Sequence, residues 1–416
     1  VHSQNKMSVG KTPAPVLNVE ELKALDEKEN IERRKKHAST KEELDDSLLE
    51  FLSISEPLVS QVKVFDQVDD MSLVHYIDEP PHRSLERYRG LILERNPNTD
   101  WGSPEYVEVC KSFPFTPEVS EAPENIREAY WSEEGTVLRV FWNNERWYIS
   151  SHRLIDCTSR KWSSKRTFGE LFDDCISREQ LSSVLDKNFV YVFLLQHPEN
   201  RIVSTFETPR LLHVQTLRSN GEILEETKVF LEHPNIACPE KVNLEGNLSE
   251  MAQNPPRGKN GILFSLEDGN YAKIVSKEYT RKRNIRGNEP NLCLRYLNLS
   301  KLETKEDSEE LLRMFPEKRR EISEVQEDVA SLNSYLYSLY RQRYISKENI
   351  ILPKDEHNII KFTRDKVYNQ VQGRFSQYSF SDLAEITRNE ISRQIAMSNP
   401  QRLLRMTKNM NEALSA

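Results

Sequence analysis

Short apolar runs separated by polar residues dominate the chain from residue 61 to residue 300 and predict β-strands. They are rich in Val, Ile, Phe, Tyr and Trp, and the clearest are Gly90–Leu93, Thr136–Phe141, Trp147–Ser150 and Tyr191–Leu195. Asn143-Asn144 lies between the second and third of these runs and predicts the turn of a β-hairpin. A short helix is predicted over 167–175, with its apolar residues on one face. We therefore expect a mixed α+β domain over 61–300, with mostly antiparallel strands.

The spacing of apolar residues lengthens to three and four in the last part of the chain. The residues that recur at this spacing are Ile322, Val325, Val329, Leu332, Leu336 and Leu339. Such spacing predicts one buried face of a helix. Two more helical stretches are predicted near 361–375 and 381–397. Residues 301–416 are therefore expected to form an all-helical C-terminal domain.

Residues 1–60 carry few apolar anchors and predict a flexible, partly disordered N-terminal arm. Thr40 and Glu43 have the spacing of a capping box for one short helix. The leucines of that helix are Leu44, Leu48, Leu49 and Leu52. An isolated helix of this length is not stable alone, so the alternative is a tether that folds on a partner.

Composition narrows the function classes. The 416 residues are 37% hydrophobic and 30% charged, and no apolar run is long enough for a membrane span or a signal segment. We expect no membrane insertion. The five cysteines include no CxxC pair, which favours the cytoplasm and predicts neither a disulfide framework nor a zinc site. A net charge of −8 argues against a general nucleic-acid coat, although a confined basic site stays open.

Common catalytic motifs are absent from the sequence. It contains no GxxxxGK phosphate loop, no GxGxxG, no GxSxG and no HExxH. The nine histidines form no close pair with metal-ligand spacing, and we expect no bound metal.

Seven segments follow one another in a characteristic order. They are Arg89–Glu94, Ser112–Phe115, Glu134–Arg139, Trp147–Arg153, His197–Val203, Asn260–Phe264 and Ala272–Tyr279. This order resembles the phage-type RNA ligases of the covalent nucleotidyltransferase superfamily, in a degenerate version similar to those of large DNA viruses of eukaryotes. The resemblance implies a nucleotidyltransferase fold over 61–300, and the helical tail stands where those ligases carry a helical C-terminal domain.

The ligase reaction needs a lysine that attacks the α-phosphate of ATP, together with carboxylates that hold a metal ion and the ribose. The resemblance places other residues at these positions. Aligning the glycine of Lys-x-Asp-Gly on Gly135 puts Ser132 at the lysine and Glu134 at the aspartate. Leu194 and Asn260 replace the glutamates of the third and fourth motifs, and Val275 replaces the second lysine of Lys-x-Lys-Ser. A serine with no evident base is a poor phosphoryl acceptor and a leucine binds no metal, so we expect no catalytic residue here.

Basic residues that remain have two interpretations each. Arg139, Arg153, Arg201 and Lys273 either line a residual phosphate pocket or form ion pairs within the scaffold. A second basic set is either a nucleic-acid surface or a solvated loop before a turn at 288–290. Its members are Lys277, Arg281, Lys282, Arg283 and Arg286. The Pro-Glu-Asn-Arg-Ile-Val stretch, 198–203, is expected to be a turn leading into a buried strand.

The resemblance and the substitutions together predict a catalytically inactive RNA-ligase-like protein. We expect a structural or interaction component of a large DNA virus, in the cytoplasm or the virion. The expected partners are capsid or assembly proteins, and no cofactor is expected. Two alternatives stay open. One is an active ATP-dependent RNA ligase that uses ATP, Mg²⁺ and a lysine outside the alignment, such as Lys111. The other is a protein that binds RNA without covalent chemistry.

Overall fold

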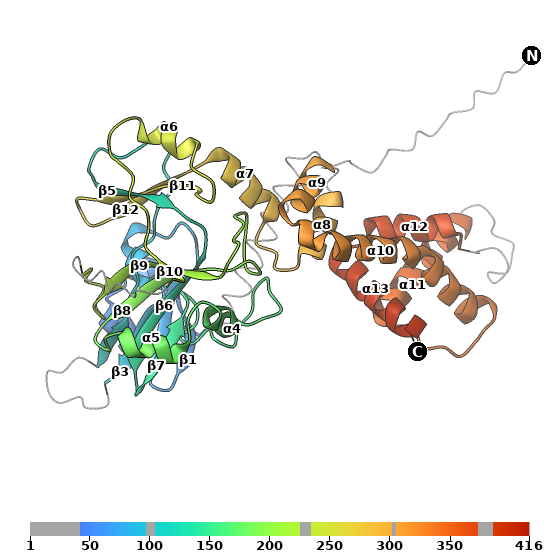
Figure 1. Ribbon diagram of the computed structural model, residues 1–416. Helices are drawn as coiled ribbons and strands as arrows, with labels where there is room; N and C mark the ends of the chain where they lie inside the picture. The colour runs from blue at the N-terminus through green and yellow to red at the C-terminus, as the bar shows by residue number, and fades with distance from the viewer. Residues whose placement is uncertain (1–41, 97–104, 225–233, 302–304, 373–385, 416) are drawn as a thin grey trace, which may run out of the picture. The chain divides into compact units, whose positions relative to one another are not determined.

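The computed structural model describes residues 42–96, 105–224, 234–301, 305–372 and 386–415 (Figure 1). The chain divides into two compact units, Val1–Arg281 and Lys282–Ala416, and the division falls within helix α7 (Lys277–Arg286). The expected boundary at 300 is therefore placed too late along the chain. The reason is that Ile285, Leu292 and Leu299 pack with the helical part of the chain, against Leu311 and Phe315.

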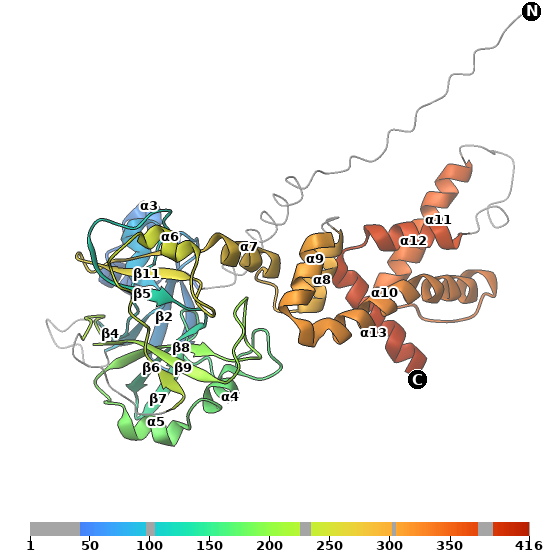
Figure 2. The ribbon, with the colours of Figure 1, turned by 45° about the horizontal axis from the view of Figure 1, so that its top comes forward.

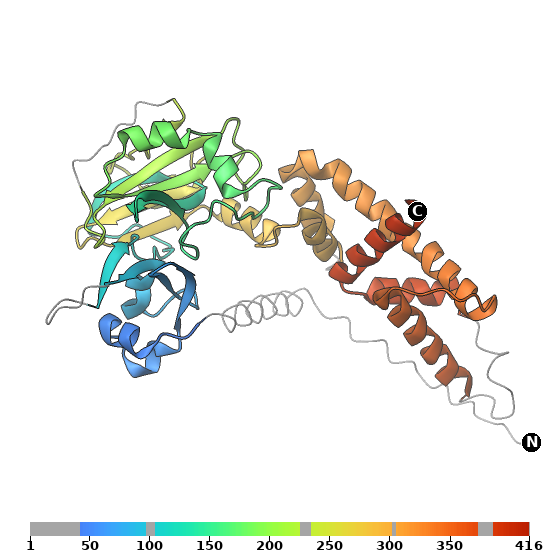
Figure 3. The ribbon, with the colours of Figure 1, turned by 90° about the horizontal axis from the view of Figure 1, so that it is seen from below.

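The first unit begins with a four-stranded antiparallel sheet. Its strands, in spatial order, are β1 (Val62–Val68), β2 (Met71–Tyr76), β3 (Leu91–Arg95) and β4 (Tyr106–Cys110). Its outer face packs on three short helices. They are α2 (Asp46–Leu52), α3 (Glu56–Val59) and η1 (Arg83–Tyr88). Figure 3 shows α2 and α3, in blue, beside the blue strands.

The described part of the expected N-terminal arm, residues 42–60, packs on this sheet. Leu48 and Leu52 are buried with Val62 and Tyr76 in one apolar cluster, so residues 42–60 are folded against the first unit. The helix is capped by Asp45, whose side chain accepts the Leu48 N–H at 2.8 Å. The expected cap, Thr40, lies outside the described residues.

A second, five-stranded sheet forms the centre of the unit. Its strands, in spatial order, are β10 (Ile236–Ala237), β9 (Arg210–Leu217), β8 (Val190–Gln196), β6 (Thr136–Asn143) and β7 (Arg146–Ser150). The β10–β9 pair is parallel and the other pairs are antiparallel. Since successive strand residues point to opposite faces, Leu138 and Val140 pack toward helices α4 (Phe168–Asp173) and α5 (Arg178–Val184). Phe141 lies on the other face and packs against the four-stranded sheet.

Two local predictions for this sheet are confirmed, with one shift. The hairpin forms between β6 and β7, but its turn residues are Asn144 and Glu145, both at positive φ, whereas Asn143 still pairs with Arg146. Two residues in this conformation match the twist of the paired strands. The predicted helix over 167–175 is α4, which begins after Thr167 with a capping box to Glu170.

A third, three-stranded antiparallel sheet completes the first unit. Its strands, in spatial order, are β12 (Tyr271–Val275), β11 (Gly261–Leu266) and β5 (Ile126–Ser132). Helix α6 (Leu248–Gln253) covers it, as Figure 2 shows. At Gly261 a β-carbon would lie 1.9 Å from the Ile274 carbonyl oxygen, so only glycine permits this close pairing of β11 with β12.

The second unit is helical throughout its described residues. After α7 its elements are α8 (Leu292–Lys301), α9 (Lys305–Met314), η2 (Pro316–Lys318), α10 (Arg319–Tyr340), η3 (Arg341–Ile345), α11 (Lys354–Gln372), α12 (Arg388–Met397) and α13 (Pro400–Ser415). Leu332 and Leu336 of the predicted apolar face are buried with Ile360 and Met406. Parts of the two further predicted stretches, at 373–385, lie outside the description. The α+β fold class with a helical C-terminal region is confirmed.

Candidate functional site

Strand register brings three of the ligase-motif positions together. In the three-stranded sheet Gly261 pairs with Ser132 on one side and with Val275 on the other. The Asn260 N–H donates to the Ser132 carbonyl at 2.9 Å, and the Asn260 carbonyl accepts the Ser276 N–H at 2.9 Å. Positions far apart in sequence, 132, 260 and 275, are therefore adjacent across three strands.

The fourth position, Leu194, reaches the same segment from the five-stranded sheet. It pairs with Val137 across β8 and β6. A β-carbon on Gly135 would lie 2.9 Å from the Leu194 β-carbon, so the leucine packs directly on this glycine. Ser132, Leu194 and Asn260 thus lie in or beside one segment, residues 132–135, and Val275 lies on the far side of β11.

Glu134, at the centre of this segment, is engaged by backbone donors. Its carboxylate is buried, with 5% of the residue exposed, and accepts the N–H groups of Ile202, Val203 and Ser204. The Tyr279 hydroxyl donates a fourth hydrogen bond at 2.9 Å. Three of these donors share Oε2 and the Ile202 N–H meets Oε1, so a metal ion would have to compete with four donors for this carboxylate.

The same contacts correct the prediction for residues 198–203. The expected turn is present, since the Asn200 N–H donates to the His197 carbonyl at 3.0 Å. The expected strand is not formed at Ile202 and Val203, and both residues are only half-buried. Their backbone N–H groups donate to the Glu134 carboxylate and are therefore not paired with a neighbouring strand.

A second buried carboxylate, Glu133, organises the basic side chains of this region. It lies 2.6 Å from the Lys259 ammonium and 2.8 Å from the Arg210 guanidinium, and its side chain is 3% exposed. Lys259 also lies 3.3 Å from Glu240. The sequence analysis did not predict this network. The available signals were an acidic residue, Glu133, directly before Glu134-Gly135 and a basic residue, Lys259, directly before Asn260-Gly261. Lys259, which lies close to Gly261 of the fourth motif, is therefore held in ion pairs.

The described residues around Ser132 contain neither a base for its hydroxyl nor a cluster of metal ligands. No His, Asp or Glu side chain described here is hydrogen-bonded to Ser132. Within the same described ranges no group of three or more His, Cys, Asp or Glu is placed to hold a metal ion. The alternative nucleophile, Lys111, lies 3.7 Å from Glu108 and packs on Gly221.

The four residues of the expected phosphate pocket have different environments. Arg139 is fully buried and donates to the Gly90 carbonyl, to Ser150 Oγ at 2.7 Å and to the Ser151 carbonyl at 2.5 Å. Lys273 lies 3.3 Å from Glu118. Arg201 is buried, whereas Arg153 is exposed and lies over a phenylalanine ring. Lys273 is thus ion-paired, whereas the hydrogen-bond partners of Arg139 are uncharged.

A cationic cluster nevertheless surrounds Arg139. Burial lowers the pKa of Arg139 and of Arg89. Burial, together with the charges of Arg153, Arg89 and Arg139, holds the pKa of His75 near 3 and the pKa of His152 well below its usual value. Two buried polar atoms of this region, Arg139 Nε and the Tyr76 hydroxyl, have no hydrogen-bond partner within the described structure. Such a cluster favours an anion over a cation.

The expected nucleic-acid stretch is helix α7, so the solvated-loop alternative is wrong. Lys277 is exposed, Arg281 lies 3.1 Å from Glu278, and Lys282 and Arg283 are half-buried. Arg286 is fully buried, donates to the carbonyls of Gly287 and Glu289, and lies over the Phe315 ring. Arg286 therefore serves the packing of its own unit and does not present its charge to a nucleic acid.

These features define an α+β protein with a helical C-terminal region. One of its motif positions, Glu134, carries a carboxylate that accepts hydrogen bonds from four donors. The chain is similar to the immediate-early protein ICP-46 homologs of invertebrate iridescent virus 3 (26% identity over 68% of the chain) and invertebrate iridescent virus 6 (25% over 80%). It is also 26% identical, over 42% of its length, to ICP-46 of frog virus 3. The matches span 62%, 79% and 50% of these proteins. The expectation of viral relatives is confirmed.

Solved structures similar to the chain include two RNA ligases. An archaeal ATP-dependent RNA ligase matches 69% of this chain and 82% of its own, with 12% identity and a TM-score of 0.37. An RNA ligase of Naegleria gruberi matches 46% and 65%, with 11% identity and a TM-score of 0.32. None of the known protein-family models matches the chain. Among the described helices none is both long enough and apolar enough to cross a bilayer.

Proposed function

We propose that this protein is a catalytically inactive RNA-ligase-like protein that works through its contacts with other molecules. The observation that carries the proposal is the environment of Glu134. A carboxylate that accepts three backbone N–H groups and a tyrosine hydroxyl holds the fold together, and a metal ion would have to compete with these four donors for it.

The remaining motif positions support the same conclusion. Ser132 supplies a hydroxyl where the ligase reaction uses an amine, and Leu194 supplies no charge. Lys259, the described amine beside the motif glycines, would have to leave Glu133 and Glu240 before it could attack a phosphate. Removing it from Glu133 would leave that buried carboxylate with one cation, Arg210, and the Gln196 amide as partners, which is costly.

The relatives named immediate-early proteins support a role inside the virus-infected cell. A role as a virion component is the second form of the same proposal. Quantitative mass spectrometry of purified particles and of infected-cell extract separates the two forms. Enrichment in particles, at a constant ratio to a capsid protein, would favour the virion role, and depletion from particles would exclude it.

Catalysis is tested in two steps. First, the protein is incubated with α-labelled ATP and Mg²⁺ or Mn²⁺, then separated under denaturing conditions beside an active RNA ligase. We expect no labelled band. Second, it receives a 5′-adenylylated RNA and an acceptor RNA. This substrate already carries the activated phosphate, so its joining needs no nucleophilic lysine, and we again expect no product.

Either positive result would overturn the proposal of inactivity. A labelled band that disappears in Lys259→Ala, but persists in Lys241→Ala, would identify Lys259 as a nucleophile. Lys241 is a matched control because its ammonium is also ion-paired, 2.5 Å from Glu128.

A second candidate function is noncovalent binding of an anionic ligand at the cluster of Arg89, Arg139 and Arg153. The buried, unpartnered Arg139 Nε and Tyr76 hydroxyl favour it, because buried donors are normally satisfied. Isothermal titration with ATP and with inorganic triphosphate tests it. Binding that is retained in the wild type and lost in Arg89→Gln would support the candidate, and an absence of heat with both ligands would exclude it.

A further inference from the structure

A basic loop, residues 160–166, lies beside the 198–203 turn in the first unit. Four of its seven residues are cationic, although the whole chain has a net charge of −8. They are Arg160, Lys161, Lys165 and Arg166. Trp162, Ser163 and Ser164 make up the rest. We refer to this segment as the basic loop.

The base of the basic loop is fixed to the body of the unit. The Phe168 N–H donates to the Arg160 carbonyl at 2.8 Å, and the Gly169 N–H donates to the Thr158 carbonyl at 3.0 Å. The two ends of the loop are therefore held together. A loop ordered before binding loses less conformational entropy when a ligand arrives.

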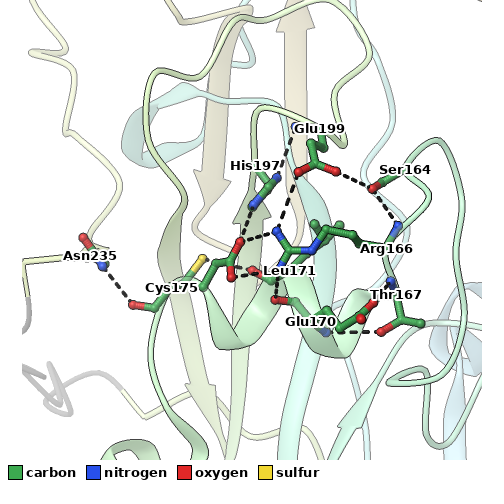
Figure 4. Close-up of polar contacts among 10 residues, drawn as sticks. Ser164, Arg166, Thr167, Glu170, Leu171, Cys175, His197, Glu199 and Asn235 are labelled. Atoms are coloured by element: carbon green, nitrogen blue, oxygen red, sulfur yellow. Dashed lines mark hydrogen bonds and ion pairs between the residues drawn. The ribbon is translucent and has the colours of Figure 1, made fainter.

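Arg166 anchors the loop to its neighbours, as Figure 4 shows. Its guanidinium makes two hydrogen bonds to Asp174, at 2.5 and 2.8 Å, and Asp174 also lies 3.2 Å from His197. The hydrogen bonds from Arg166, supported by His197, lower the pKa of Asp174 to about 2. Ser164 Oγ donates to Glu199 at 2.8 Å. Asp174 and Glu199 thus hold Arg166 and Ser164 in place.

The other three cations of the loop have no such role. Arg160, Lys161 and Lys165 are all exposed. Among the residues that the structure describes, none of the three has an ion-pair partner within 4.0 Å. Trp162 lies between them in sequence and is half-buried. The loop therefore combines a local excess of positive charge with an aromatic surface.

We propose that the basic loop binds the phosphate backbone of single-stranded nucleic acid, with Trp162 stacking on one base. Exposed cations interleaved with an aromatic side chain suit this ligand, since the cations contact phosphates and any base can stack on an indole. An acidic protein segment would use the cations but would leave the indole without a base to stack on. This inference goes beyond the proposed function, because binding by the loop requires neither activity nor inactivity at the motif positions.

Fluorescence anisotropy with a short labelled oligouridylate and the full chain tests the proposal. Wild-type affinity should fall steeply between about 50 and 200 mM salt. The triple variant Arg160→Glu, Lys161→Glu, Lys165→Glu should bind at least about tenfold more weakly at low salt. Its slope of log affinity against log salt should be smaller by about 2, for three lost phosphate contacts on a single strand. Trp162→Ala, which keeps every charge, should weaken binding about fivefold or more.

A matched control separates the loop from the overall charge. The variant Arg83→Glu, Arg257→Glu, Lys361→Glu changes three exposed cations elsewhere and alters the net charge equally. It should keep most of the affinity. Thermal unfolding of each variant, compared with the wild type, confirms that the fold is retained.

Three results would overturn the proposal. They are no binding by the wild type, an equal loss in the control variant, and displacement of the RNA by polyglutamate at matched charge concentration with Trp162→Ala unaffected. The last would assign the loop to an acidic protein partner. None of these results bears on inactivity at the motif positions, which the adenylylation assays measure separately.

Discussion

Replacing Glu134 by Gln tests whether this carboxylate supports the fold. The substitution keeps the shape of the side chain but removes its charge, and it places an amide NH₂ where one carboxylate oxygen accepted a hydrogen bond. Oε2 accepts from Val203, Ser204 and Tyr279, whereas Oε1 accepts from Ile202. If the glutamine oxygen takes the side with three donors, its NH₂ group faces the Ile202 N–H, and two donors then oppose each other in a buried site.

The expected loss of stability follows from these contacts. A hydrogen bond to a charged group contributes about 1.5–3 kcal/mol, and a buried donor left unsatisfied costs about 1–3 kcal/mol. We therefore expect Glu134→Gln to lower the free energy of unfolding of the first unit by about 3 kcal/mol. For a unit of this size the Tm should fall by about 6–12 °C. Tyr279→Phe, which removes one donor only, should cost about 1 kcal/mol.

Differential scanning calorimetry measures the Tm, and hydrogen exchange at 202–204 reports on the amides directly. Glu145→Gln is the matched control, because it removes one charge from an exposed turn residue and should leave the Tm within about 1 °C. The same scan is repeated with Mg²⁺. If Glu134 binds no metal, Mg²⁺ should not raise the wild-type Tm, because a ligand stabilises only the state that binds it. A Tm of Glu134→Gln equal to that of the control, or a Tm raised by Mg²⁺ in the wild type alone, would refute the reasoning.

Two further predictions concern the sheets around the site. In Gly261→Ala the new β-carbon would meet the Ile274 carbonyl oxygen at 1.9 Å, so urea unfolding should show a loss of about 3 kcal/mol or more. Gly258→Ala, with nothing within 4 Å, should cost about 1 kcal/mol, and equal losses in the two variants would contradict this explanation. His75 stays neutral in the folded state to about pH 3, whereas an unfolded histidine takes a proton near pH 6.5. Because the unfolded state then binds more protons, stability should fall as the pH drops below about 6.5, by up to about 1.4 kcal/mol per pH unit for this group. His75→Asn keeps an acceptor for the Gly90 N–H and should flatten a pH series of urea unfolding, whereas unchanged slopes would show that His75 contributes nothing.

Much of the fold was predictable from the sequence because it depends on local patterns. Short runs of apolar residues predicted β6, β7 and β8, and steps of three and four predicted the buried face of α10. Thr167 and Glu170 similarly sit at the spacing of the capping box that begins α4. In each case the residues that form the element are neighbours in the chain, so their spacing carries the information.

The site depended on contacts that no local pattern contains. Glu134 meets Val203 across 69 residues and Tyr279 across 145 residues, so the sequence showed the carboxylate but not its four donors. Arg286 failed as a surface candidate for the same reason, since its burial depends on the packing of Phe315 and the carbonyls around it.

The sequence alone determined the types of element, the order of the motif segments and the missing lysine, because these follow from residue identity and short spacing. Only the tertiary structure decided which groups occupy the place of that chemistry. It brings residues 194 and 260 beside the segment 132–135, with residue 275 across β11, and the backbone amides at 202–204 donate to a carboxylate and not to a strand. Buried polar groups must find partners, and which partners they find is settled by the folding of distant segments against one another.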